Sequence, residues 1–318
     1  MEHQFHDWLK SKTSSSTTST RRLAGSPAVQ TGIGDDAAIV DFTGQPLVIT
    51  TDAIAEGTHF SLSDTKLGGK TPAKVFERIG RKALAVSLSD IAAMGATPFA
   101  ATLTFQCPKR LTIDDLKSLY AGAARLADEF ELEIVGGDTN TWDDGLVVSS
   151  TVFGTRKPEL TGWSLDGAKD GDAIYVSGEF GGSIHGRHFD FEPRLRLASY
   201  LADNHQINSA TDASDSLTMD LMAIAKASDV AFEIDLYAVP ISGDVRAIEG
   251  KSRLEHALCD GEDFELIFTV SSEVAKQLDQ ISNLPTPITK IGRASLGSPA
   301  IFDLDNKPIL VGGYEHKG

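Results

Sequence analysis

Aspartates stand repeatedly at points where an apolar run of this sequence ends. Asp52 follows the run from Pro46 to Thr51, Asp90 lies inside the apolar end of a helical segment, and Asp138 follows a short strand. Apolar segments with strand and helix patterns in alternation predict an α/β fold, and such folds place their ligand sites at strand ends. A buried aspartate also needs a hydrogen-bond partner or a metal. The pattern therefore predicts a site built from carboxylates.

The stretch from Gly32 to Val40 reads Gly-Ile-Gly-Asp-Asp-Ala-Ala-Ile-Val. Its glycines match part of a dinucleotide-binding fingerprint, but a polar stretch precedes them where that fingerprint needs a strand. Asp35 and Asp36 would also repel a phosphate placed against the turn. Because paired carboxylates in an oxygen-rich loop attract hard cations, we interpret the stretch as part of a metal site that binds phosphates indirectly. An acidic surface turn before a strand is the alternative.

Length and composition limit the classes of protein. A chain of 318 residues is long enough for two domains. Its net charge of −16 argues against nucleic-acid binding. No apolar run approaches the roughly 20 residues that span a bilayer, and the N-terminus has no apolar core like that of a signal peptide. Cys107 and Cys259 cannot form a disulfide framework or a zinc cluster, so we expect a cytoplasmic protein.

The periodicity predicts three segments. Residues 1–30 form a short helix and a mobile Ser/Thr-rich segment, residues 31–157 an N-terminal domain, and residues 158–318 a C-terminal α/β domain. We expect a strand over 131–135 that ends in a tight turn at Gly136-Gly137-Asp138. A helix is expected to open at Thr211 and run to about residue 227, which would let Asp212 and Asp215 face one point. Stabilisation of that helix N-terminus by the two acids is the alternative.

Seven acids share this setting, namely Asp35, Asp36, Asp52, Asp90, Asp138, Asp212 and Asp215. If they converge, they require either several divalent cations or strongly raised pKa values. The sequence contains no Walker lysine and no zinc-ligand spacing. Phosphoryl transfer needs mainly positioning and charge neutralisation, which Mg²⁺ supplies with few basic residues. The sequence therefore predicts Mg²⁺-dependent phosphate chemistry.

Several motifs resemble those of the thiamine-monophosphate kinase family, in family order from about residue 30 to 270. They are Gly32-Ile-Gly-Asp-Asp-Ala-Ala, Thr50-Thr-Asp52, Lys82-Ala-Leu-Ala-Val-Ser-Leu-Ser-Asp90-Ile-Ala-Ala-Met-Gly-Ala, Gly136-Gly-Asp-Thr, Gly167-Ala-Lys-Asp-Gly-Asp172, Ala213-Ser-Asp215 and Gly261-Glu-Asp-Phe-Glu-Leu266. The wider superfamily includes aminoimidazole ribonucleotide synthetase, selenophosphate synthetase and a hydrogenase maturation factor. The first and last motifs resemble the thiamine branch in particular.

The resemblance implies two aminoimidazole ribonucleotide synthetase-like domains, each a mixed sheet covered by helices. The domain over 31–157 would bind ATP and Mg²⁺, and the N-terminal sheets of two subunits would pair in a homodimer. The activity implied is ATP-dependent phosphorylation of thiamine monophosphate to thiamine diphosphate. Transfer would be direct and in line, assisted by several Mg²⁺ ions, with no catalytic side chain that carries the phosphate.

The resemblance also implies roles for individual residues. The Mg²⁺ ligands would be Asp36, Thr50, Thr51, Asp52, Asp90, Asp138, Asp212 and Asp215. ATP would contact Gly137, Asp138 and Ser214, while His59 and Glu262 would face the thiamine phosphate. Without the resemblance, His59 is equally well a loop histidine in an ordinary hydrogen bond, and Glu262 a solvated acid.

The sequence departs from the family pattern at four places. Ser216 stands where the family has glycine, and Gly162 and Trp163 stand where it has an ATP-contacting arginine, for which Arg156 is a distant substitute. The chain is shorter between Gly182 and Pro193, around His185 and His188, and an aromatic residue is replaced near Val311, close to Tyr314. A kinase for another small phosphorylated acceptor, or a weakly active protein that binds nucleotide or thiamine phosphate, is therefore an alternative.

Overall fold

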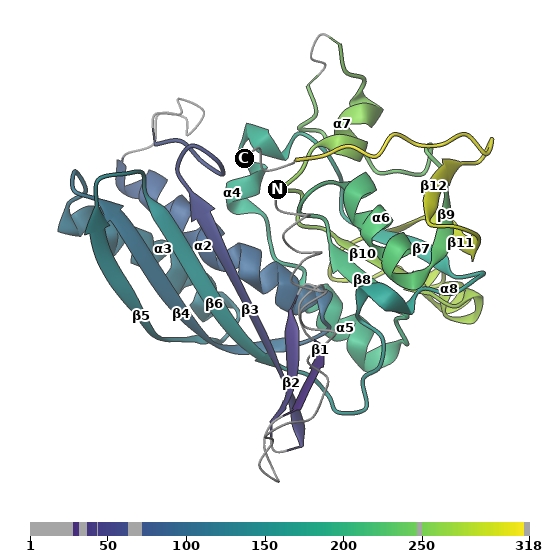
Figure 1. Ribbon diagram of the computed structural model, residues 1–318, viewed down its shortest axis with the longest axis horizontal. Coiled ribbons are helices and arrows are strands. Elements are labelled where there is room, and N and C mark those ends of the chain that lie inside the picture. Colours follow the sequence, from purple (N-terminus) through teal and green to yellow (C-terminus); the bar gives the residue numbers. More distant parts are fainter. Residues whose placement is uncertain (1–27, 32–36, 43, 63–71, 247–249, 315–318) are drawn as a thin grey trace.

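The computed structural model describes residues 28–31, 37–42, 44–62, 72–246 and 250–314. Asp36, with the predicted N-terminal helix and Ser/Thr-rich segment, lies outside the described residues. Within these ranges the strands form two sheets that lie side by side, each covered by helices (Figure 1). The prediction of an α/β fold with mixed sheets is confirmed.

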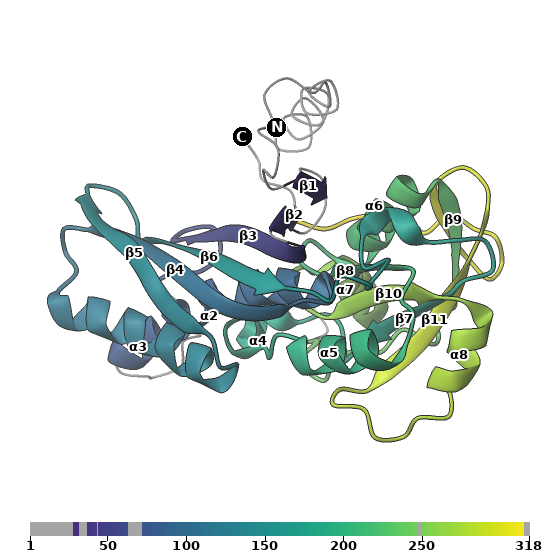
Figure 2. The same ribbon diagram turned by 90° about the horizontal axis from the view of Figure 1, so that it is seen from below.

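The N-terminal sheet has the strand order β1-β2-β3-β6-β4-β5 in the described residues. The strands are β1 (Ala28–Thr31), β2 (Ala38–Phe42), β3 (Gln45–Ala55), β6 (Val147–Thr155), β4 (Thr97–Pro108) and β5 (Glu133–Trp142). Only the β4–β5 pair among these is parallel. Helices α2 (Pro72–Ala93) and α3 (Ile113–Glu129) cover one face, and no described helix covers the other (Figure 2).

Helix α2 packs closely against α3 because glycines stand where the two helices cross. A Cβ atom on Gly80 would lie 1.8 Å from the carbonyl oxygen of Leu119, and one on Gly122 would lie 1.8 Å from that of Glu77. Any side chain at either position would separate the helices. This close packing holds the buried face of α2, which carries Ser87 and Asp90, firmly under the sheet.

The C-terminal sheet has the strand order β12-β9-β11-β7-β10-β8 in the described residues. The strands are β7 (Ala173–Ser177), β8 (Ser209–Asp212), β9 (Val230–Ile234), β10 (Leu266–Val270), β11 (Ile288–Leu296) and β12 (Ala300–Asp303). The helices are α4 (Arg187–Asp190), α5 (Leu195–Asn204), α6 (Leu217–Ser228), α7 (Arg253–Cys259) and α8 (Ser272–Leu278), with short 3₁₀ turns η3 (Leu165–Gly167) and η4 (Ser183–His185).

The two sheets share one hydrophobic core. Buried side chains of α2, such as Ile79 and Leu88, belong to the same cluster as Phe264 and Phe268 of the C-terminal half. The chain passes between the sheets over residues 156–172, where Trp163 is fully buried in that cluster. The junction is therefore a packed interior, and polar groups placed there are held in fixed positions.

Two local predictions were wrong. Thr211 does not open a helix: it pairs with Ile267 in strand β8, and α6 begins only at Leu217 with Ser216 as its N-cap. The strand predicted to stop before Gly136 instead continues as β5 through the glycines to Trp142. In both cases pairing with a neighbouring strand overrides the local turn or helix propensity of the residues.

Among the helices of the described ranges, none combines the length and the apolar character needed to cross a bilayer.

Candidate active site

A cavity of about 570 Å³ lies where the two halves of the molecule meet. Its walls come from the end of β3 and the turn after it, the turn after β8, the segment before β10 and the C-terminal segment. The lining residues include Asp52, Thr58, His59, Ile184, Ser214, Asp215, Cys259, Asp260, Glu262, Phe264 and Tyr314. No lysine or arginine is among the described residues that line it. An anion in this cavity would therefore need a cation from outside the protein.

Asp52 and Asp90 meet beneath the N-terminal sheet. Asp52 of β3 points toward α2, where Ser87 donates a hydrogen bond from Oγ to Asp52 Oδ2 (2.8 Å). Thr50, two residues earlier on the same face, donates to Asp90 Oδ2. Burial raises the pKa of Asp52, and hydrogen bonds with Ser87 and Asp90 only partly offset it. The site thus holds a carboxylate whose charge is costly without a positive partner.

Asp212 approaches the same place from the other sheet. It is the last residue of β8, is almost fully buried, and its Oδ2 has no hydrogen-bond partner. Burial, together with the charges of Asp52 and Asp215 and against a hydrogen bond with Ser89, raises its pKa to about 7. Asp220 of α6 accepts the backbone N–H groups of Asp215 and Ser216 (3.2 Å each), which fixes the turn after β8.

The hydroxyl and carboxylate groups of this site are chemically suited to bind a divalent cation. In the part of the chain that the structure describes, no three His, Cys, Asp or Glu side chains are arranged around one point as bound metal ligands would be. However, the donors are all oxygens, as Mg²⁺ prefers, and the unpartnered Oδ2 of Asp212 needs a positive partner. A cation would also relieve the repulsion that raises the pKa of Asp212. We therefore regard the site as suited to Mg²⁺.

Two further predicted metal ligands lie on the opposite face of the sheet. Thr51 donates to the carbonyl of Ser150 (3.0 Å) on the face away from α2. By strand register Asp138 shares that face, and it accepts hydrogen bonds from Thr139 N–H (2.8 Å) and Asn140 Nδ2 (2.7 Å). Three strand spacings, about 14 Å, separate it from β3. The described chain thus brings together Thr50, Asp52, Asp90, Asp212 and Asp215, but not Thr51 or Asp138.

Gly137 and Ser214, both predicted to contact ATP, are in different surroundings. A Cβ atom on Gly137 would lie 1.8 Å from the carbonyl oxygen of Leu103, and its φ is +155°, so only glycine fits this point of β5. Ser214 lies in the turn after β8 and lines the cavity. Its carbonyl accepts the N–H of Glu262 (2.7 Å), which joins the two loops that form this wall.

His59 and Glu262, both predicted to face the thiamine phosphate, line the cavity. His59 Nδ1 accepts the N–H of Ala55 (3.1 Å), which orients its ring in the turn after β3. Glu262 is not a solvated acid: its Oε1 accepts from Lys82 Nζ (2.6 Å), and its Oε2 lies 3.1 Å from His188 Nδ1. Burial alone would raise its pKa, but the contacts with His188 and Lys82 outweigh it and lower the pKa to about 2. Glu262 is therefore ionised at neutral pH.

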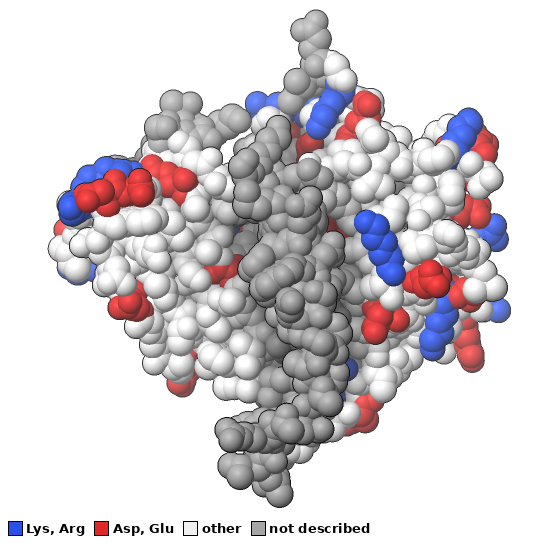
Figure 3. All heavy atoms as spheres, in the orientation of Figure 1, with Lys and Arg blue, Asp and Glu red and all other residues white. Residues whose placement is uncertain are grey.

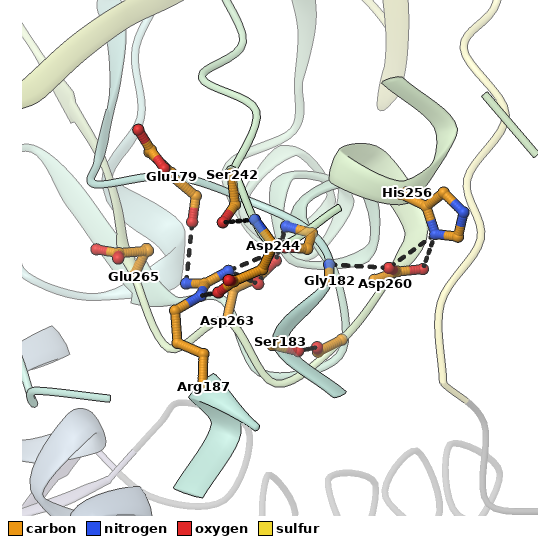
Figure 4. A network of polar contacts seen from close by, with 12 residues as sticks. Glu179, Gly182, Ser183, Arg187, Ser242, Asp244, His256, Asp260, Asp263 and Glu265 are labelled. Atoms are coloured by element: carbon orange, nitrogen blue, oxygen red, sulfur yellow. Dashed lines mark hydrogen bonds and ion pairs between the residues drawn. The ribbon is translucent and has the colours of Figure 1, made fainter. Parts of the chain in front are cut away.

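The segment that carries Glu262 is fixed by a polar network (Figure 4). Arg187 Nη2 donates to Asp263 Oδ1 (2.8 Å) and to the carbonyl of Gly181 (3.0 Å). Asp263 in turn accepts the N–H of Gly181 (2.9 Å), and Asp260 accepts that of Gly182 (3.1 Å). The acidic segment is thereby tied to the glycine turn that follows β7. The sequence motif from Gly261 to Leu266 contains Asp263 but gave it no role, and Arg187 was not predicted to take part.

Comparisons with known proteins agree with this geometry. The family model described as AIR synthase related protein, N-terminal domain, matches residues 34–156. A protein named thiamine-monophosphate kinase from Rhodopirellula baltica is 37% identical over 305 residues, covering 92% of this chain and 89% of the relative. One of the same name from Bacillus subtilis is 35% identical over 326 residues, covering 93% of this chain and 96% of the relative. The chain belongs to the thiamine-monophosphate kinase family.

The fold is also similar to a solved structure, AaThiL complexed with AMPPCP and TMP. That match has a TM-score of 0.76 at 28% sequence identity and covers 90% of this chain and 92% of that one. The departures from the family pattern can therefore be interpreted on a shared backbone, residue by residue.

Ser216, where the family has glycine, does not strain the turn. Its φ of 173° is extended backbone that any residue adopts. Its Oγ accepts the N–H of Met219 (3.1 Å) and donates to the carbonyl of Gly312 (2.7 Å). The serine thus caps α6 and also fixes the C-terminal segment. Tyr314, whose N–H donates to Asp215 (3.2 Å), lines the cavity, whereas Val311 does not.

Arg156, the distant substitute for the expected arginine, lies far from the cavity of its own chain. It follows β6 at the end remote from Asp52, where its N–H donates to Pro46 (3.3 Å) and its Nη2 to Leu160 (2.6 Å). Six residues along a strand separate it from Ser150, the neighbour of Asp52, or about 20 Å. Trp163 is fully buried and faces the core instead of the cavity.

Proposed function

We propose that the protein transfers the γ-phosphate of ATP to thiamine monophosphate, forming thiamine diphosphate and ADP. The observation that carries the proposal is the cavity at the junction, where Asp52 and Asp215 line the same space as His59 and Glu262. Relatives across nearly the whole chain are named for this activity, and AaThiL has been solved with AMPPCP and TMP.

Mg²⁺ would be held by Thr50, Asp52, Asp90, Asp212 and Asp215, and when bound it neutralises the charge of the transferring and accepting phosphates. Both reactants are anions, and no lysine or arginine is among the described lining residues. This lining supports a requirement for more than one Mg²⁺. Roles for Asp36, Thr51 and Asp138 as ligands, and for Gly137 toward ATP, stay predictions.

The residues of the chain then have separate tasks. Ser214 and the backbone of its turn would contact the nucleotide phosphates next to the carboxylates. Glu262, being ionised, suits the cationic ring or the amino group of a thiamine phosphate, while His59 offers a ring edge on the adjacent wall. The shared core behind them excludes water from one side of the cavity. Transfer occurs directly between the two bound phosphates.

The proposal includes a homodimer in the cytoplasm. The face of the N-terminal sheet that α2 and α3 leave open carries few charged side chains (Figure 3). Phe99 and Val135, on the strands β4 and β5, are 47% and 59% exposed. A sheet face with few charges and exposed apolar side chains supports pairing with a second copy. Cys107 and Cys259 are free thiols, which suits a reducing compartment.

The proposal is tested with purified protein, ATP, Mg²⁺ and thiamine monophosphate, by chromatography of thiamine diphosphate and ADP. We expect both products in equal amounts, at a rate that rises with free Mg²⁺ beyond the concentration that saturates ATP. ADP release with another phosphorylated acceptor alone would contradict the acceptor. Tight nucleotide binding without any product would favour the weakly active alternative.

A further inference from the structure

We propose that Lys82 is a positioning residue for the acceptor, because its ammonium group fixes both His59 and Glu262 at the cavity wall. This inference rests on the proposed function, in which these two residues face thiamine monophosphate. Lys82 does not line the cavity itself and is fully buried behind the wall.

The contacts of Lys82 account for all three of its N–H donors. Nζ donates to Glu262 Oε1 (2.6 Å), to the carbonyl of His59 (3.2 Å) and to His188 Nδ1 (2.8 Å). The lysine belongs to α2 of the N-terminal half, whereas Glu262 precedes β10 of the C-terminal half. One ammonium group therefore joins the two loops that would contact the acceptor, across the junction between the sheets.

The third contact brings His188 into the same group. Its Nδ1 lies 2.8 Å from Lys82 Nζ and 3.1 Å from Glu262 Oε2, so one ring nitrogen faces both charged groups. Burial lowers the pKa of His188, which favours its neutral form. A neutral histidine does not balance the charge of Glu262, so in the described chain the cation that contacts this carboxylate is Lys82.

A fully buried lysine is uncommon because desolvation disfavours its charge, and burial does lower the pKa of Lys82 while Glu262 opposes the shift. A stabilising contact between the two halves does not require such a group. Arg78, one turn earlier on α2, joins α2 to α4 through Asp190 (2.6 Å) and the carbonyl of Gly186 (3.0 Å), neither of which lines the cavity. Lys82 differs from Arg78 because it contacts His59 and Glu262, which line the cavity.

The test compares Lys82→Met with Arg78→Met in the full chain. Each variant removes a cation of α2 that contacts the C-terminal half, so both are expected to lower the melting temperature. For Lys82→Met we expect the KM for thiamine monophosphate to rise at least about tenfold, with the KM for ATP changed less than about threefold. For Arg78→Met both KM values should stay within about twofold of the wild type.

Two more variants keep the test decisive if Lys82→Met does not fold. Lys82→Met with Glu262→Gln removes both buried charges, so no uncompensated carboxylate remains. If Lys82 acts through Glu262, the KM of this double variant for thiamine monophosphate should match that of Glu262→Gln alone within about threefold. Lys82→Arg retains the charge, but its planar fork cannot serve the same three acceptors, and it should restore only part of the affinity.

The outcomes separate the two proposals. Normal turnover by the wild type with an unchanged KM for thiamine monophosphate in Lys82→Met would overturn the role of Lys82 alone. That role is also overturned if Lys82→Met raises the KM values for ATP and thiamine monophosphate equally, as general loosening of the junction would do. A wild type that neither binds thiamine monophosphate in calorimetry nor phosphorylates it would overturn the proposed function, and the role of Lys82 with it.

Discussion

One group of acids lies on each side of the cavity. The two groups differ in whether a cation of the protein contacts them. At the junction, Asp52 and Asp212 have hydroxyl groups of Ser87 and Ser89 as hydrogen-bond partners and other carboxylates as charged neighbours. In the segment before β10, each of three acids has a cation of the protein: Lys82 contacts Glu262, Arg187 contacts Asp263, and Arg194 contacts Glu265.

The presence or absence of a protein cation distinguishes acids with a structural role from acids suited to bind an external cation. A carboxylate paired with a protein cation needs no external cation, so it positions its neighbours or contacts a substrate through an oxygen that the cation leaves open. A buried carboxylate beside other carboxylates is destabilising until an external cation arrives. The chain therefore has its own cations behind one wall of the cavity, and in the proposed function the other wall receives Mg²⁺.

The largest effect is expected from Asp52→Asn. The amide still accepts from Ser87 but contributes no charge to a bound cation, so kcat/KM for phosphorylation should fall by at least about 10²–10³-fold. Because one costly buried charge is removed, the melting temperature without Mg²⁺ should not decrease. Asp143→Asn, at an 82% exposed side chain, is the control and should retain activity. Steady-state kinetics with Mg²⁺ titration gives the measurement, and a loss below tenfold would contradict the assignment.

Breaking the second group should reduce stability and leave chemistry intact. Arg194 pairs through two nitrogens with Glu265, whose side chain is 1% exposed. Arg194→Met leaves that carboxylate buried without its cation, and we expect a loss of about 3–5 kcal/mol in the free energy of unfolding. Arg196→Met, two residues later at an exposed pair, should cost no more than about 1 kcal/mol. Urea unfolding of both variants measures this, and equal losses would show that the buried pair has no special weight.

A smaller effect concerns pH and Asp263. Burial raises its pKa to about 7, against the opposing influence of Arg187 and the N–H of Gly181, whereas in an unfolded chain it is about 3.9. The folded state therefore binds a proton at Asp263 more tightly than the unfolded state does. This contribution to the free energy of unfolding is complete below about pH 4. It declines as the pH rises to about 7, by at most about 4 kcal/mol. Asp263→Asn should remove this part of the dependence of the free energy of unfolding on pH.

The measurement for Asp263 is urea unfolding in EDTA between pH 5 and pH 8. Asp244→Asn is the matched control, since Asp244 contacts the same arginine at 3.3 Å but has a 51% exposed side chain. It should leave the slope of the wild type unchanged. If Asp263→Asn also retains that slope, the proton taken up on folding resides elsewhere.

Much of the fold could be predicted from the sequence because the apolar patterns are strong. Strand β3, which carries Asp52, and strand β10, which follows Asp263, both coincide with apolar runs of the sequence. The error at Thr211 has a physical cause: a strand of four residues gives too short a pattern, and only its pairing with β10 makes it a strand. Local sequence does not contain that information.

The sequence predicted the carboxylates of the candidate site but not the basic residues behind it. Aspartates at the ends of apolar runs are visible because a charge interrupts a pattern. Lys82 interrupts one too, three residues after Ile79 on the apolar face of α2, so a signal for it existed. Its partners, however, are His59, His188 and Glu262. The spacing of these residues along the chain does not predict that they contact Lys82. Which face of the sheet Thr51 and Asp138 occupy likewise depends on strand register.

The shared core has a consequence for how the protein is made. During synthesis the N-terminal half leaves the ribosome first, yet part of the apolar surface of α2 is covered by residues such as Phe264 and Phe268. The nascent N-terminal half thus keeps this surface uncovered while most of the rest is translated, and Lys82 stays hydrated until Glu262 has been added. Until residue 264 has been added, the growing chain therefore exposes apolar surface that the folded protein buries.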